Sequence, residues 1–359
     1  MIRLDAPLMV SWGLVLGFGL VMVASASVAM ETPFLARHGI YLAMGLMGFL
    51  LMLCVPLKVW NHTYQVALLG ALTLCALVVV PGFAEEVKGA RRWIDFGSFT
   101  LQPAEIAKAA MILYWAGFLA RRDEALRESP LPALLPLVFF AGLVALLILQ
   151  RDFGNVVVLS VVLGAMLFLA GLRLRYFGLL VLAGILALAG LIWMEPYRVE
   201  RLVSFSDPWA SAFDSGYQLT HSLIAFGRGE VFGLGLGEGI QKLWYLPEAH
   251  HDFIFAVIAE ELGLVGALAL MALLGLIVAR ILYVARMAIA GGDKFAGYLC
   301  YGVALLLGVQ TLINVGVATG SLPTKGLTLP FISYGGNSLI VCATLVGLVG
   351  RAQLERDTR

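Results

Sequence analysis

The chain has 359 residues, of which 61% are hydrophobic and 13% are charged, whereas soluble domains have roughly 45–50% and 25%. Water therefore cannot be its main solvent. Its formal net charge of +1 provides no overall basic field, so we expect no nucleic-acid partner. The four cysteines and five histidines show no spacing typical of a metal site, and we expect no zinc.

Long apolar stretches recur along the whole chain, separated by segments that contain charged residues, proline or glycine. A helix needs roughly 20 apolar residues to cross a bilayer, and continuous rather than alternating apolar runs predict helices. We therefore predict a single all-α membrane domain over residues 1–359 with about ten transmembrane helices. In chain order, the predicted spans are 8–30, 38–57, 64–82, 104–120, 131–149, 153–171, 176–194, 253–279, 295–319 and 334–350.

The basic residues predict the orientation, because short cytoplasmic loops are enriched in Lys and Arg. Thirteen of them fall on the side of the two termini, from Arg3 to Arg359, and the short opposite loops hold only Arg37, Arg151 and Lys325. Both termini should therefore be cytoplasmic. The two longest connections, about 83–103 and 195–252, then lie outside, the second between helices 7 and 8. Their aromatic, glycine and charged content leads us to expect ordered loops.

The first chemical cluster, residues 88–108, reads KGARRWIDFGSFTLQPAEIAK and leads into the predicted fourth span. Glu105 and Lys108 share one helical face at this spacing, and ionisable groups near a span are costly unless paired or facing a cavity. A structural ion pair and a substrate-facing role are both open. The loop before them could contact substrate or anchor in lipid headgroups. Its candidate residues are Lys88, Arg91, Arg92 and Trp93.

The long second outer loop contains the glycine-rich run GYQLTHSLIAFGRGEVFGLGLGEG at residues 216–239. A dinucleotide-binding fingerprint requires a preceding strand in a βαβ unit, and no such context is present, so we interpret the glycines as turns or close packing. Four basic residues flank this run and are candidate anion contacts, although solvated surface charge is the alternative for each. They are Arg198, Arg201, Arg228 and Lys242.

Residues 247–263, PEAHHDFIFAVIAEELG, carry a polar outer loop directly into the predicted eighth span, with Asp252 at the junction. A helix N-terminus stabilises a carboxylate, whereas partial burial at the membrane surface raises its pKa. Such a group can act as a general base. An ordinary helix N-cap is the alternative for Asp252.

The last cluster, residues 323–338, reads PTKGLTLPFISYGGNS. Its two prolines and paired glycines predict a broken or re-entrant segment before the tenth span, and irregular backbone at membrane depth must be buried in protein or line a cavity. Gln310 and Asn314 are polar residues within the ninth span. We expect them to hydrogen-bond between helices.

Taken together and in this order, the clusters resemble the RodA and FtsW proteins, the SEDS family of bacterial peptidoglycan glycosyltransferases. The resemblance covers essentially the whole chain and rests on KGARRWIDFG with QPAEIAK, on RLVSFSDPWASAFDSGYQLTHSL, on LPEAHHDFIFAVIAEELG and on PTKGLTLPFISYGGNS. Departures from the family pattern at His251 and Asn337 are polar exchanges. The motifs KGARRW and EIAK favour a RodA-type protein of cell elongation and shape, whereas PTKG and LPEAH also occur in FtsW-like chains.

This resemblance implies a ten-span protein of the bacterial cytoplasmic membrane that polymerises lipid II, an undecaprenyl-pyrophosphate disaccharide pentapeptide. It also implies a class B penicillin-binding protein as partner, together with membrane proteins of the elongation complex and the lipid bilayer. Asp252 matches the proposed catalytic aspartate of the family. Its functional tryptophan falls on Trp93, and its QPxExxK motif includes Glu105 and Lys108.

The implied reaction converts an α-linked glycosyl pyrophosphate into a β-1,4 linkage, so the displacement inverts the anomeric carbon. Asp252 would be the general base on the acceptor hydroxyl. Basic side chains or a divalent cation such as Mg²⁺ would stabilise the departing pyrophosphate; the metal requirement stays open. The basic candidates are Lys88, Arg91, Arg92, Arg198, Arg201 and Lys325.

Two other functions compete with this one. A lipid II flippase would use Glu105, Lys108 and the broken segment as a path through the membrane, but the candidate groups gather at the predicted outer face. A non-catalytic scaffold would leave Asp252 dispensable. A polymerisation assay with purified protein and lipid II discriminates among the three.

Overall fold

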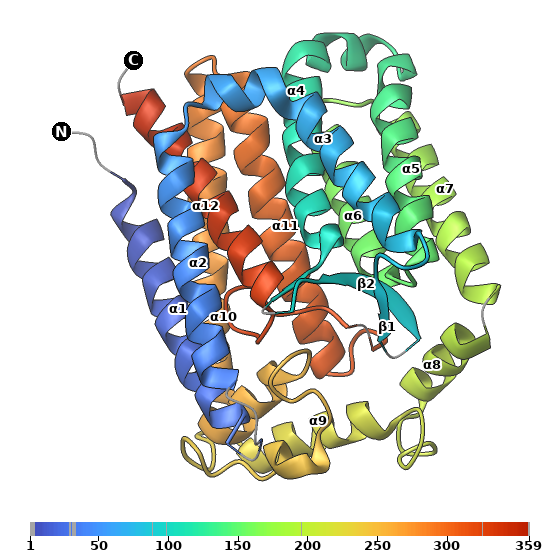
Figure 1. The fold of residues 1–359 in the computed structure, drawn as a ribbon, viewed down its shortest axis with the longest axis vertical. Coiled ribbons are helices and arrows are strands. Elements are labelled where there is room, and N and C mark those ends of the chain that lie inside the picture. The colour runs from blue at the N-terminus through green and yellow to red at the C-terminus, as the bar shows by residue number, and fades with distance from the viewer. Residues whose placement is uncertain are drawn as a thin grey trace.

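The computed structural model describes residues 4–28, 30, 34–87, 89–97, 99–194, 196–324 and 326–357. Within these residues the chain forms a bundle of ten helices of 16 residues or more (Figure 1). They are α1 (Ala6–Ala26), α2 (Phe34–Cys54), α3 (Leu57–Val79), α4 (Pro103–Glu128), α5 (Leu134–Leu149), α6 (Phe153–Leu169), α7 (Leu174–Trp193), α10 (Ile254–Ala290), α11 (Lys294–Ala318) and α12 (Gly336–Asp357).

Each predicted span coincides with one of these helices, which confirms the helical membrane fold. In the described part of the chain, eight helices are long and apolar enough to cross a membrane. Helix α4 falls outside this set because it carries charged residues at both ends, and α6 is apolar but only 17 residues long. The count of ten spans therefore stays a prediction.

Several helix ends follow local sequence rules. Asp5 caps α1 by accepting from the Leu8 amide at 2.9 Å, and Asp152 and Asp293 cap α6 and α11 in the same way. These side chains satisfy amide groups that a helix start leaves without partners. Pro103 occupies the first position of α4, where its missing N–H costs nothing.

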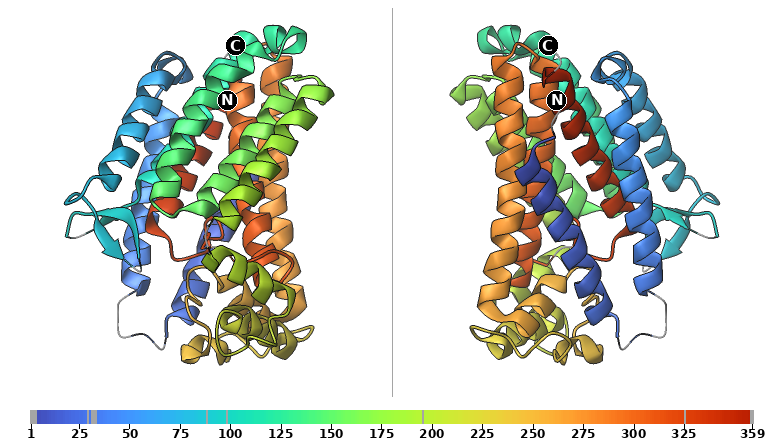
Figure 2. Two further views of the ribbon diagram at one scale, coloured as in Figure 1. Left: turned by 90° about the vertical axis from the view of Figure 1, so that its right-hand side faces the viewer. Right: turned by 90° about the vertical axis from the view of Figure 1, so that its left-hand side faces the viewer.

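The loops predicted to be cytoplasmic gather at one end of the bundle, together with both termini (Figures 1 and 2). There Arg280 of α10 pairs with Asp5 before α1, and Lys294 bridges to Asp123 of α4 at 2.9 Å. The long loops lie at the opposite end. The structure thus groups the loops as the basic residues predict, and which end faces the cytoplasm stays a prediction.

Both long loops are ordered over their described residues. The first contains a three-stranded antiparallel sheet in the order β1 (Glu85–Val87), β2 (Ala90–Asp95), β3 (Thr100–Leu101); these strands were not expected in an all-α chain. The second contains α8 (Pro196–Ser206), α9 (Tyr217–Gly229) and a short helical turn over Gln241–Tyr245. Figure 1 shows α8 and α9 covering the end of the bundle away from the termini.

Helix α10 is broken at Gly263, whose backbone is not helical (φ 66°, ψ −168°). Asp252 lies level with Asn314, whose amide donates to the Asp252 carbonyl at 2.9 Å, one turn inside the end of α11. Glu261 instead binds Ser25 at the far end of α1. Residues 254–262 therefore run away from the end of the bundle that holds the termini, and residues 264–290 run back across the bundle toward it. The expectation of an unbroken span over 253–279 is thereby corrected, because the chain reverses at a glycine that tolerates positive φ.

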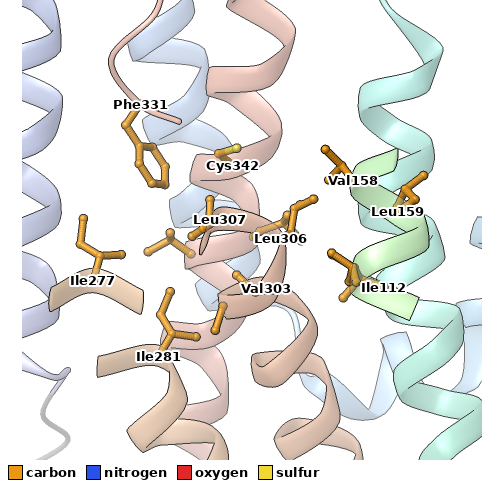
Figure 3. Packing of buried hydrophobic residues seen from close by; sticks show 14 of the residues in the cluster. Ile112, Val158, Leu159, Ile277, Ile281, Val303, Leu306, Leu307, Phe331 and Cys342 are labelled. Atoms are coloured by element: carbon orange, nitrogen blue, oxygen red, sulfur yellow. The ribbon is translucent and has the colours of Figure 1, made fainter. Parts of the chain in front are cut away.

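The segment between α11 and α12 is re-entrant, as the prolines and glycines predict. Phe331 packs edge-on against Trp12 in the first half of α1, with ring centroids 6.3 Å apart, and is 2% exposed. Figure 3 shows Phe331 beside the buried core formed by α4, α6, α10, α11 and α12. Its backbone also meets α1 at Gly19, where any side chain would collide with the Phe331 carbonyl. Two re-entrant segments thus meet inside the bundle.

Candidate functional site

Asp252 lies where the two re-entrant segments meet. The Asn314 side-chain amide bridges them, donating to the Asp252 carbonyl at 2.9 Å and to the Leu327 carbonyl at 2.6 Å. The Tyr334 amide adds a bond to the His250 carbonyl at 2.9 Å. The Asp252 side chain itself is 18% exposed. A partly buried carboxylate is therefore held on a backbone that hydrogen bonds fix to α11 and to the segment between α11 and α12.

The contacts of Asp252 do not match an ordinary helix cap. Phe253 occupies the cap position of α10 and makes no side-chain capping bond, whereas the Asp252 carboxylate pairs with the imidazole of His251. Desolvation of the ring opposes its protonation, but the Asp252 charge and hydrogen bond, aided by Glu248 and Glu105, outweigh it and raise the pKa of His251. The carboxylate is therefore available for chemistry rather than engaged with backbone amides.

Glu105 and Lys108 form the predicted ion pair in the first two turns of α4. Lys108 Nζ lies 2.7 Å from Glu105 Oε1, and both side chains are buried. The Glu105 charge acts on His251, so the pair lies on the same side of the bundle as Asp252. Within the described residues, Glu105 Oε2 has no hydrogen-bond partner. The pair thus lies near the site without lining its cavity, and its contact with substrate stays a prediction.

A cavity of about 480 Å³ adjoins Asp252. Arg92, Arg151 and Arg201 contribute to its wall, as does Gly326, and a methyl group on Gly326 would lie 3.2 Å from Asp252 Oδ2. The remaining wall is largely apolar, with residues of α6, α7, α11 and the segment between α11 and α12. These are Phe153, Val157, Leu188, Ile192, Ile313 and Leu322. Positive charge and an apolar surface therefore meet in one hollow next to the carboxylate.

Two of the predicted basic residues line this cavity. Arg92 projects from β2 and donates from Nε to the Gln150 carbonyl at 3.2 Å and from Nη2 to the Arg151 carbonyl. Arg201, on α8, donates to the Thr324 carbonyl at 3.4 Å. At the level of the sequence, Arg151 contributed only to the count of basic residues that predicts the membrane orientation. Its approach to Arg92 and Arg201 depends on the fold, and no local motif signals it.

Trp93 and Arg91 occupy the opposite side of β2 from Arg92, because side chains alternate along a strand. Trp93 is half-buried, opposite Glu85 in the sheet, and Arg91 lines a smaller hollow with Gln150 and Arg151. Neither lines the large cavity. Their proposed contact with substrate therefore stays a prediction.

The remaining basic candidates divide into two groups. Lys88 and Lys325 lie outside the described residues, as does the side chain of Arg198. Lys242 and Arg228 are in ion pairs rather than free for an anion: Lys242 Nζ lies 2.6 Å from Glu261 Oε1, with both side chains buried, and Arg228 Nε lies 3.0 Å from Glu260 Oε1. Over the described part of the chain, no group of three or more His, Cys, Asp and Glu side chains is arranged to hold a metal ion.

The sequence matches the model of the FtsW, RodA and SpoVE cell cycle proteins over residues 6–358. The chain belongs to this family. Members named probable peptidoglycan glycosyltransferase FtsW are similar to it over nearly its whole length. The protein from Saccharophagus degradans is 47% identical (98% of this chain, 93% of the relative), and that from Pseudomonas fluorescens is 44% identical (99% and 89%).

Two solved structures share the same fold. A chain of a peptidoglycan synthase complex superposes with a TM-score of 0.82 at 28% identity, covering all of both chains. The rod shape determining protein RodA of Thermus thermophilus gives a TM-score of 0.73 at 29% identity, covering 99% of this chain and 98% of that one. The predicted family and helical membrane architecture are thereby confirmed.

Proposed function

We propose that this chain is a peptidoglycan glycosyltransferase that polymerises lipid II at the outer face of the bacterial cytoplasmic membrane. The observation that carries the proposal is the Asp252 carboxylate at the edge of a cavity that is cationic on one side and apolar on another. A lipid-linked glycosyl pyrophosphate has an anionic pyrophosphate to match the cationic side and a lipid chain to match the apolar side. The names of the FtsW relatives support the same activity.

The proposed mechanism is a single displacement. The Asp252 carboxylate takes the proton from the acceptor 4-hydroxyl as its oxygen forms a bond to the donor's anomeric carbon. The bond from that carbon to the pyrophosphate breaks at the same time, and the anomeric configuration inverts. Pyrophosphate leaves as an anion, so the arginines of the cavity stabilise charge that grows during the reaction. No second carboxylic acid is then required.

The neighbours of Asp252 suit this role. His251 is partly exposed and paired with the carboxylate, so it orients the base and holds it in the ionised form. Glu105 and Lys108 line the inner side of the site in our proposal, with Lys108 directed to the sugar or pyrophosphate. If a divalent cation takes part, Asp252 and the substrate's phosphate oxygens would supply its oxygen ligands.

Within the family, we propose an FtsW-type role in cell division. The earlier preference for RodA, elongation and cell shape is not confirmed: the FtsW relatives are 44–47% identical, and the RodA of Thermus thermophilus is 29% identical. The family description as cell cycle proteins agrees with division. The similarity to a chain of a peptidoglycan synthase complex supports a class B penicillin-binding protein as the cross-linking partner.

The test incubates the purified full-length protein with lipid II, with and without a class B penicillin-binding protein, and measures glycan polymer. Asp252→Asn should insert and unfold like the wild type yet form no polymer, since it keeps the shape but removes the base. Asp214→Asn, at an exposed position of the second outer loop, is the matched control and should remain active. Normal polymer from Asp252→Asn would refute the base assignment. Lipid II translocation without polymer would favour a flippase.

A further inference from the structure

The three arginines of the cavity differ in how many of their guanidinium N–H donors already form hydrogen bonds within the protein. Arg92 commits two of its guanidinium nitrogens, Nε and Nη2, to the carbonyls of Gln150 and Arg151. It therefore ties β2 of the outer sheet to the corner between α5 and α6. Arg201 is engaged as well, through the Thr324 carbonyl. Both side chains have structural contacts that a ligand would have to share.

Arg151 is different. Its side chain is exposed and lines both hollows of this region, and in the described part of the chain its guanidinium has no hydrogen bond or ion pair with another residue. One of its terminal nitrogens passes over Gly89, 3.5 Å from where a side chain would begin. All five N–H donors are therefore available to a ligand.

The backbone at Arg151 is unusual in a way that serves this placement. Its φ is +57°, a left-handed conformation that residues other than glycine, asparagine and aspartate rarely adopt. The Arg151 amide donates to the Ile148 carbonyl at 2.9 Å, and the carbonyl accepts from Arg92. Strained backbone of this kind is retained mostly where function requires it. Here it turns the chain sharply between α5 and α6.

We propose that Arg151 is the principal ligand of the pyrophosphate, and that Arg92 is a positioning residue that holds the Arg151 backbone. This inference rests on the proposed function and names the contact that binds the leaving group. A guanidinium matches phosphate oxygens in a two-pronged geometry that an ammonium cannot reproduce. The cavity wall also includes Phe153 and Gly154, the first residues of α6, and the Asp152 carboxylate that caps this helix, so the three arginines leave the wall with a net positive charge.

The test compares Arg151→Asn with Arg92→Gln in the purified full-length protein. Asparagine adopts the left-handed backbone readily, so Arg151→Asn removes the guanidinium and keeps the turn. Arg175→Gln, at an exposed arginine of α7, controls for the loss of one positive charge. The probe is undecaprenyl pyrophosphate, bound in the presence of excess phosphatidylglycerol, and thermal unfolding is measured on the same samples.

Arg151→Asn should bind the probe about 10- to 100-fold more weakly, with a melting temperature equal to or above that of the wild type. Arg92→Gln should lower the melting temperature, because two carbonyls lose their donor. Arg175→Gln should change neither. Unchanged affinity in Arg151→Asn would overturn the proposal, as would a melting temperature that falls as far as in Arg92→Gln, or displacement of the probe by phosphatidylglycerol.

Polymerisation of lipid II by the wild type is measured separately. This measurement distinguishes a failure of the Arg151 assignment from a failure of the proposed function. Polymer formation with unchanged probe binding in Arg151→Asn refutes the Arg151 assignment alone. Weakened probe binding in Arg151→Asn, with no polymer from the wild type, refutes the proposed function and supports Arg151 as a pyrophosphate ligand.

Discussion

The contact between His251 and Asp252 makes the stability of the site depend on pH. The carboxylate raises the pKa of His251 above its ordinary value, so the folded state favours the imidazolium. The resulting stabilisation is complete below about pH 6.5, the unfolded value, and is lost as the pH rises through the higher folded value. His251→Gln should therefore lower the melting temperature in acidic buffer and have little effect in alkaline buffer. A difference that grows with pH would contradict this.

Glu105 and Lys108 provide a second prediction for single residues. Removing one partner leaves an uncompensated buried charge, which costs about 3–5 kcal/mol in buried pairs, so Glu105→Ala and Lys108→Ala should each lose stability and most activity. The exchange of Glu105→Lys with Lys108→Glu restores opposite charges at the same spacing. We expect it to recover much of the melting temperature but not the activity, because a carboxylate would then stand where substrate requires an ammonium.

Polymer yield and thermal unfolding, measured together on both single variants and the exchange, decide between contact with substrate and a purely structural pair. An exchange variant that is both stable and active would show the pair to be structural.

At the scale of elements, the reversal at Gly263 determines where Asp252 lies. A methyl group there would approach the Gly233 amide nitrogen to 2.4 Å and the Val231 carbonyl oxygen to 2.5 Å, in a backbone with φ of +66°. Gly263→Ala should therefore destabilise the protein by about 3 kcal/mol or more and abolish polymerisation. Gly275→Ala is the matched control in the same helix, because no atom of the described residues lies within 4 Å of the added methyl.

Gly275→Ala should leave activity intact and raise stability by up to about 1 kcal/mol. Thermal unfolding and polymer yield test both variants. A Gly263→Ala protein with normal stability would mean that the reversal is not rigid.

The buried ion pair of Lys242 and Glu261 stabilises the same reversal of α10. Lys242 uses its three donors on Glu261, Ser25 and the Gly237 carbonyl, at 2.6 to 2.8 Å, and the second oxygen of Glu261 accepts from the Gly237 amide. Every partner is satisfied, which is the condition under which buried charge is tolerated. This network joins α1, the second outer loop and α10 at the point where the chain turns back.

At the scale of the whole molecule, the orientation in the membrane is the open prediction. Reporter fusions after Arg122, Arg286 and Arg351 should report the cytoplasm, because basic residues concentrate at that end of the bundle. A fusion near Asp214 in the second outer loop should report the outside. The reversed pattern would place Asp252 on the wrong side of the membrane for a polymerase of exported precursor.

Much of the fold could be predicted from the sequence because hydropathy in lipid is a local property. Each apolar stretch must form a helix to satisfy its own backbone, so the position of every long helix follows from its own residues. The pair of Glu105 and Lys108 was predictable for the same reason, since three residues of helix bring them together. The sheet over Glu85–Leu101 was not, because its strands are short and lack a clear alternation of apolar residues.

The sequence by itself determined that this protein is a helical membrane protein, which loops share an end of the bundle, and that Asp252 and the arginines are candidates for chemistry. Only the tertiary structure decided that α10 reverses at Gly263, that Asp252 is held by Asn314, and that Arg151 joins the cavity. Those features depend on contacts between residues far apart in the chain, such as the 62 positions between Asp252 and Asn314. Local periodicity carries no information about such contacts, because packing between helices sets them.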